Sequence, residues 1–76
     1  MLEGMEGELQ RTLGRNLRRY REQHGLSQED FAHVLGVHRT YMGGIERGER
    51  NLTLKSVERL AATIGVEPVE LLRSGE

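Results

Sequence analysis

Residues that start and stop helices recur along this 76-residue chain at short intervals. Ser27 and Thr53 are good N-cap residues, because a side-chain oxygen there accepts a hydrogen bond from the first helical turn. Glycine commonly follows the end of a helix, and proline is favoured in a first turn. Further residues of these two kinds are Gly25, Gly36, Gly48, Gly65 and Pro68. The chain is therefore divided into short segments.

Apolar residues within these segments repeat at helical spacing, which predicts a helix in each. The expected helices are 9–23, one between Ser27 and Gly36, 38–46, one between Thr53 and Gly65, and a short one from Pro68. Their apolar positions are Leu9, Leu13, Leu17, Tyr20, Phe31, Ala32, Leu35, Met42, Ile45, Leu54, Val57, Leu60, Ala61 and Ile64, with Val37 buried in a turn. No segment alternates with a period of two, so an all-α fold of five short helices is predicted.

The length of the chain predicts one domain with a small core. A chain of this size buries only about 60% of its unfolded surface, and the absence of cysteine excludes a disulfide. Residues 1–8 lack periodicity and are expected to be a flexible lead-in to a domain over 9–76. No apolar run approaches the roughly 20 residues of a membrane span, and no secretion signal opens the chain. We expect a soluble, cytoplasmic protein without a membrane partner.

The charge is distributed unevenly although the net charge is only -1. Half of the acids lie near the two ends of the chain. The first helix carries a run of arginines with no acid between them, and a second cationic group surrounds 38–46. These basic residues are Arg11, Arg15, Arg18, Arg19, Arg21, Arg39, Arg47, Arg50 and Lys55. Such a distribution gives a positive face to a nearly neutral protein, although ordinary solvated helix faces remain an alternative.

The run 25–51 is a helix-turn-helix candidate, and a short helix braced by another fits the major groove of DNA. It resembles the lambda-repressor-like (XRE-type) helix-turn-helix family in Leu26-Ser27-Gln28-Glu29, Gly36-Val37 and Ile45-Glu46-Arg47-Gly48. The resemblance covers about 10–72, and 39–51 looks most like the controller proteins of restriction–modification systems. It implies a five-helix DNA-binding domain in which 38–46 is the recognition helix.

Candidate DNA contacts surround this helix. Arg39 can pair with guanine and Thr40 with a thymine methyl group, and the resemblance places both at base edges. It also implies a phosphate contact for Gln28, whereas His38 replaces the preferred cap and is expected to donate to a phosphate. The glycine pair permits close approach to DNA or marks a poorly formed helix end. The predicted DNA-binding residues are Gln28, His38, Arg39, Thr40, Tyr41, Gly43, Gly44, Arg47, Arg50 and Asn51.

Other constellations have structural interpretations. The resemblance implies an ion pair between Arg21 and Glu46, with two independent surface charges as the alternative. Glu29, Asp30 and His33 have spacings that suit a metal, but they lack a fourth ligand. We therefore expect no metal, no cofactor and no small-molecule ligand.

The last two helices are predicted to form a two-fold dimer interface, because their apolar residues exceed what a small core can cover. Those residues are Ile64, Val66, Val69, Leu71 and Leu72. Two recognition helices about 34 Å apart would then fit successive turns of DNA. The predicted function is a homodimeric regulator of double-stranded DNA with a (pseudo)palindromic operator.

Two other classes of function are alternatives. An antitoxin or other protein-interaction module needs a partner-binding segment, for which only 1–8 is spare. An enzyme is disfavoured, because the chain has no cysteine, no serine–histidine arrangement and no phosphate-binding glycine loop.

Overall fold

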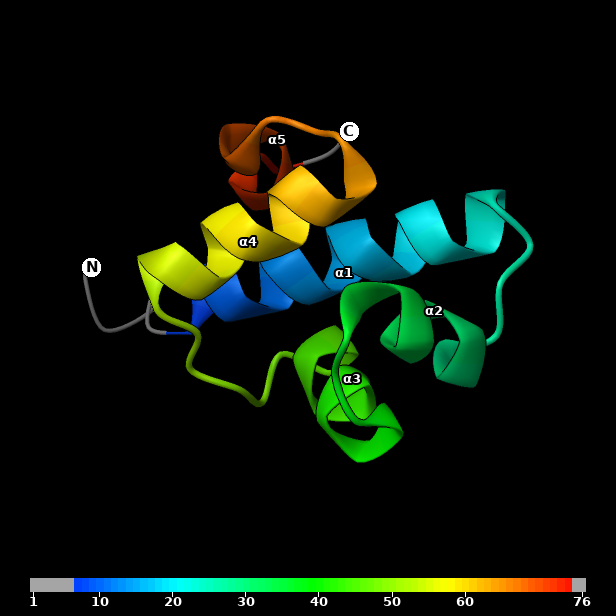
Figure 1. Ribbon diagram of the computed structural model, residues 1–76. Helices are drawn as coiled ribbons and strands as arrows, with labels where there is room; N and C mark the ends of the chain where they lie inside the picture. The colour runs from blue at the N-terminus through cyan, green and yellow to red at the C-terminus, as the bar shows by residue number, and fades with distance from the viewer. Residues whose placement is uncertain (1–6, 75–76) are drawn as a thin grey trace.

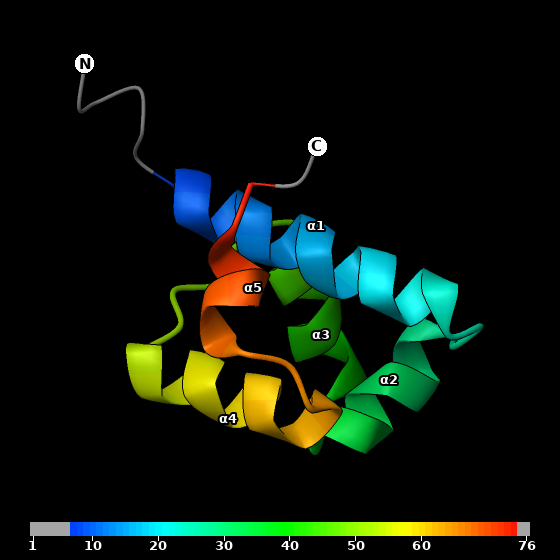
Figure 2. The same ribbon diagram turned by 90° about the horizontal axis from the view of Figure 1, so that it is seen from above.

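The computed structural model describes residues 7–74 and confirms the predicted all-α fold, with no strand in that range (Figure 1). The helices are α1 (Glu8–Gln23), α2 (Gln28–Leu35), α3 (Arg39–Glu46), α4 (Leu54–Ile64) and α5 (Pro68–Leu72). The first helix contacts both α3 and α5, while α2 contacts α3 and α4. Figures 1 and 2 together place α3 and α5 on opposite sides of the molecule, α5 at the top of Figure 1 and α3 at the bottom.

The helix boundaries follow from local chemistry. The Ser27 hydroxyl accepts from a backbone N–H of α2 at 3.0 Å, and Thr53 does the same for α4. Gly36 has φ +73°, a left-handed conformation that glycine adopts without a steric penalty, and this conformation makes the α2–α3 turn. Two boundaries differ from the prediction by one residue, because His38 lies before α3 as its N-cap and Glu8 opens α1. The rest of the predicted lead-in, 1–6, lies outside the described residues.

The core contains most of the predicted apolar positions. Its buried residues are Leu13, Leu17, Phe31, Ala32, Leu35, Met42, Ile45, Val57, Leu60, Ala61 and Leu71. Leu9 and Leu54 are exceptions among the predicted apolar positions, because they are 60% and 76% exposed. Both lie in the first turn of a helix, beyond the end of the core. Val37 is also less buried than predicted and packs against the core edge.

Leu71 belongs to the core of a single chain, so its prediction as a dimer contact is wrong. Its exposure is only 4%, whereas Val69 on the same helix is 57% exposed. The Asn16 side-chain amide of α1 donates to the backbone carbonyls of Leu71 at 2.8 Å and Arg73 at 2.9 Å. These bonds hold α5 against α1, and that packing decides which side of the five-residue helix is buried.

Gly14 allows α1 to approach the end of α3 closely. A Cβ atom at this position would lie 2.4 Å from the Ile45 carbonyl oxygen and 2.6 Å from that of Glu46. Because both obstacles are backbone atoms, no side-chain movement relieves the clash. Glycine therefore sets the separation of α1 and α3. Within 7–74, none of the helices combines the length and apolar character needed to cross a membrane.

Candidate nucleic-acid interface

An ion pair fixes the inner face of α3. The Arg21 guanidinium donates from Nε to Glu46 Oε2 at 2.7 Å and from Nη2 to Oε1 at 3.1 Å. The two side chains are only 13% and 4% exposed, so the pair predicted from the sequence is present and largely buried. Hydrogen bonding to Glu46 raises the pKa of Arg21 and outweighs the opposing effect of burial. Arg21 also donates to the Leu26 carbonyl at 3.0 Å, which extends the network into the α1–α2 turn.

Gln28 joins this network from the start of α2. Its Nε2 donates to Glu46 Oε1 at 3.0 Å, and the side chain is partly buried. The amide therefore has a structural role that the sequence did not indicate. Its second N–H remains for a phosphate oxygen, so the predicted DNA contact stays a prediction.

The outer face at the start of α3 carries exposed polar side chains. Arg39 and Thr40 are both exposed, and Arg39 makes no ion pair or side-chain hydrogen bond with the residues that the structure describes. His38 Nδ1 accepts from the Thr40 backbone N–H at 3.0 Å. His38 therefore caps α3 in place of the residue types preferred there. Nε2 is the ring nitrogen that remains for an outside partner.

Arginine side chains cover the glycine pair in α3. A Cβ on Gly43 would meet Arg47 Nη1 at 3.1 Å, and one on Gly44 would meet Arg50 Nε at 3.0 Å. The Arg50 guanidinium also lies over the Tyr41 ring, 5.0 Å from its centroid. The glycines thus provide room for two cationic side chains. Both glycines are buried within a continuous helix, so the alternative of a poorly formed helix end is wrong, while close approach to DNA stays a prediction.

The loop after α3 is tied to its surroundings by two exposed contacts. Arg47 Nε lies 3.1 Å from Glu49 Oε1, so Glu49 partly neutralises the predicted cationic loop. Asn51 Oδ1 accepts from Gln10 Nε2 of α1 at 2.7 Å. Its own amide hydrogens remain available for a DNA phosphate. The contact with Gln10 therefore holds the loop against α1.

The charge on α1 is also partly neutralised. Arg11 pairs with Glu8 at 3.0 Å, and Arg18 pairs with Glu22 at 3.1 Å. Arg15 and Arg19 of α1 are exposed and form no ion pair with the described residues, so α1 keeps part of its positive charge. No group of three acidic or histidine side chains within 7–74 is placed to hold a metal ion, and this holds for Glu29, Asp30 and His33.

Three positioning residues on α1 were not predicted from the sequence, namely Gln10, Gly14 and Asn16. A glycine in the middle of a long helical pattern costs about 1 kcal/mol relative to alanine, and this cost was a usable signal for Gly14. The two amides gave no comparable signal, since their partners are 41 to 57 residues away in the chain.

Comparison with known proteins places this geometry in a family. A family model described as helix-turn-helix matches residues 17–71. Control protein C.SmaI of Serratia marcescens is 42% identical over 65 residues, which cover 86% of this chain and 77% of that protein. Control protein C.BamHI of Bacillus amyloliquefaciens is 36% identical over 69 residues, covering 90% of this chain and 85% of that protein.

Solved structures agree with these relatives. The restriction-modification controller protein C.AhdI from Aeromonas hydrophila aligns with a TM-score of 0.73 and 42% identity, over 86% of this chain and 94% of that one. The hypothetical transcription factor NHTF from Neisseria aligns with a TM-score of 0.78 and 38% identity, over 87% and 76% respectively. The chain therefore belongs to the helix-turn-helix family of DNA-binding transcription regulators.

Proposed function

We propose that this regulator binds a two-fold symmetric operator as a homodimer, as a controller protein of a restriction–modification system. One observation carries the proposal. Arg39 and Thr40 are exposed on the first turn of a helix whose last residue, Glu46, is fixed by its buried carboxylate. A rigid helix with exposed donors suits base readout, because the positions of the donors are set before DNA arrives.

The side chains around α3 divide into two roles. Arg39 suits a bidentate contact with guanine, because it extends from the first helical turn and pairs with no other side chain in 7–74. Arg50 and Asn51 lie in the loop beyond α3, where contacts with the sugar-phosphate backbone set register and general affinity. Gln28 adds a backbone contact at the start of α2.

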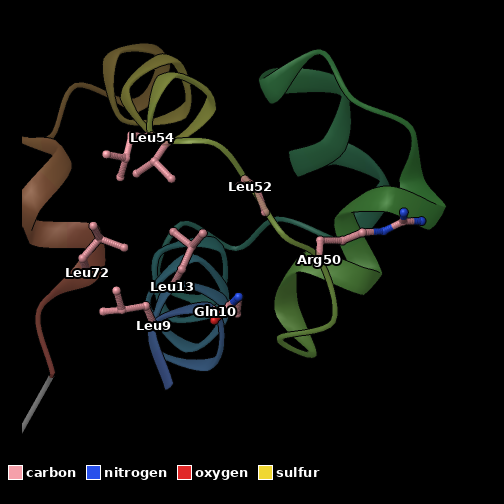
Figure 3. Close-up of a pocket in the computed structure, with 8 residues that line it drawn as sticks. Leu9, Gln10, Leu13, Arg50, Leu52, Leu54 and Leu72 are labelled. Atoms are coloured by element: carbon pink, nitrogen blue, oxygen red, sulfur yellow. The ribbon is translucent and has the colours of Figure 1, made fainter. Parts of the chain in front are cut away.

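An apolar surface on α1, α4 and α5 supports association of two copies. Figure 3 shows Leu9, Leu13, Leu54 and Leu72 around a pocket, with a cavity volume of about 160 Å³. Leu9 and Leu54 are exposed, and Val69 is exposed one helical turn from Leu72. Exposed large apolar side chains around a hollow are typical of an interface. In this proposal Val69 and Leu72 contact the second copy, together with the half-buried Ile64 and Val66.

Selection of duplexes from a random DNA pool tests the operator. The proposal predicts enrichment of an inverted repeat whose half-sites are about 10 base pairs apart, one helical turn of DNA. A single asymmetric site, or no enrichment, would contradict it. Gel retardation with the region upstream of the protein's own gene then tests autoregulation, and adjacent methyltransferase and endonuclease genes would support the controller role.

Sedimentation of two matched variants tests the dimer. Val69→Glu places a charge on the proposed interface and is expected to weaken dimerisation tenfold or more, on the order of 1–3 kcal/mol. Val34→Glu is the control, because Val34 is a similarly exposed valine on α2, at 49%. A monomeric wild type at tens of micromolar, or equal effects of the two variants, would argue against this interface. A charge at the buried Leu71 would test folding and not association.

A further inference from the structure

Three helices of this domain begin with a side chain that accepts a hydrogen bond from the first turn. Ser27 caps α2 and Thr53 caps α4 with hydroxyl oxygens, and His38 caps α3 with an imidazole nitrogen. A hydroxyl keeps its lone pairs at every pH near neutrality. The imidazole does not, since histidine is the side chain whose charge ordinarily changes between about pH 5 and 8. Among these caps, only that of the recognition helix can be removed by a proton.

The geometry of the cap specifies one form of the ring. Nδ1 of His38 lies 3.0 Å from the Thr40 backbone nitrogen and accepts its hydrogen. An accepting Nδ1 carries no proton, so a neutral ring bears its hydrogen on Nε2. Protonation places an N–H on Nδ1, opposite the N–H of Thr40. It also adds positive charge at the positive end of the helix dipole, which is unfavourable.

The capped turn contains the two side chains proposed to reach base edges. Arg39 and Thr40 are the first two residues of α3, which has only eight residues. Gly43 and Gly44 lower the intrinsic helix propensity by about 1 kcal/mol each relative to alanine. A short helix with two glycines depends more than most on its cap. Fraying of its first turn would move both side chains at once.

We propose that His38 is a positioning residue whose neutral imidazole holds Arg39 and Thr40 in place for DNA. Protonation of this ring removes the cap and loosens the helical turn that carries both side chains. The effect on DNA affinity rests on the proposed function, whereas the effect on helix stability does not. Glu29 and His33 of α2 and Arg39 of α3 line the same surface hollow as His38.

Thermal unfolding of four proteins tests the cap. These are the wild type, His38→Ala, His38→Asn and His33→Gln. Asparagine is a good cap that does not titrate, and His33→Gln removes a neighbouring charge change while keeping the cap. At about pH 8, His38→Ala is expected to melt about 4–8 °C below the wild type, and His38→Asn to melt close to it.

The second comparison is between melting temperatures measured at high and at low pH. The cap stabilises the fold while His38 is neutral, and this contribution is lost as pH falls through the titration of the ring. Between about pH 8 and 5, the melting temperature of the wild type should fall about 4–8 °C further than that of His38→Asn. His33→Gln should keep the larger, wild-type loss. Equal losses for the wild type and His38→Asn would overturn the proposal.

Nitrogen NMR of the ring gives a direct readout. At about pH 8, Nδ1 of His38 should be unprotonated and Nε2 protonated, and the Thr40 amide shift should follow the titration of the ring. A ring with its hydrogen on Nδ1 would overturn the proposal, because that form cannot accept from Thr40. This measurement needs no DNA.

DNA titrations at the same two pH values test the functional consequence. Relative to His38→Asn, the wild type should lose about fivefold in affinity on acidification, the equivalent of a cap of about 1 kcal/mol. A relative gain would show that the protonated ring contacts a phosphate, and it would overturn the positioning role. If no protein binds DNA but the melting and NMR results hold, the proposed function fails while the neutral cap stands.

Discussion

Two arginine–glutamate ion pairs lie at the end of α3 and in the loop after it, and the two pairs differ in burial. Arg21 and Glu46 on the inner face are 13% and 4% exposed, and two hydrogen bonds join them. Arg47 and Glu49, just beyond the helix, are 60% and 59% exposed. The residue types are the same, so the difference comes from the surroundings of each pair.

Burial changes what a pair can do. An exposed pair contributes little to stability and is screened by salt, so Arg47 can exchange Glu49 for a phosphate at small cost. Removing one partner of a buried pair leaves an uncompensated charge without water. The inner pair therefore holds α3 in place, while the outer arginine remains available to DNA.

The largest expected effect comes from breaking the inner pair. Glu46→Ala leaves the Arg21 guanidinium without its partner and should lower the free energy of unfolding by about 3–5 kcal/mol. Glu49→Ala is the matched control and should change it by less than about 0.5 kcal/mol. Urea unfolding of both variants measures the difference. If Glu46→Ala unfolds like the wild type, burial does not distinguish the two pairs.

The next effect concerns the contact between α1 and α3. Gly14→Ala forces a Cβ against backbone carbonyls and should cost about 1–3 kcal/mol in unfolding free energy. The substitution should also weaken DNA binding, because it displaces α3. This effect is expected even though Gly14 itself is buried and does not contact DNA. The neighbouring Arg15→Ala, on the exposed side of α1, is the control. A stable Gly14→Ala protein with unchanged DNA affinity would show that α3 tolerates displacement.

On the outer face, Arg39→Ala should cost about 1–3 kcal/mol of operator affinity and reduce discrimination at one base pair in each half-site. The fold should be unaffected, since Arg39 is exposed. Titrations on operator and scrambled duplexes separate the two possible contacts. Equal losses on both duplexes would assign Arg39 to a phosphate and leave base readout to Thr40 or Tyr41.

The smallest effect is expected for Arg50→Ala, which should weaken binding to operator and scrambled DNA alike. The slope of log affinity against log salt should become shallower by about one unit, because one phosphate contact is lost. Titrations at several salt concentrations measure this slope. Since Arg50 lies over Gly44 and Tyr41, a loss confined to the operator would instead place it in the groove.

The features predicted best from the sequence were the local ones. Ser27, Thr53 and Pro68 mark helix starts through contacts within one turn, so their role is readable without the fold. The ion pair of Arg21 with Glu46 was expected from family resemblance, because nothing local joins residues 25 positions apart.

The errors arose where packing between distant segments decides the outcome. Leu71 and Val69 are both apolar in a five-residue helix, and only the contact with α1 determines which is buried. The path of Arg50 across α3 depends on the space above Gly44, which sequence spacing does not reveal. Gln28 was assigned to DNA alone because its internal partner, Glu46, comes from another helix.

The amide of Asn16 has a consequence for how the domain assembles. It donates to the Leu71 carbonyl across a separation of 55 residues, and closing so long a loop is costly in entropy, so we expect this bond to form late in folding. A contact made late in folding acts mainly on the unfolding rate. Asn16→Ala should therefore shorten the lifetime of the folded state while leaving the refolding rate nearly unchanged. The lifetime of the folded regulator then depends on how α5 packs against α1, on the side of the molecule opposite the proposed DNA-binding surface.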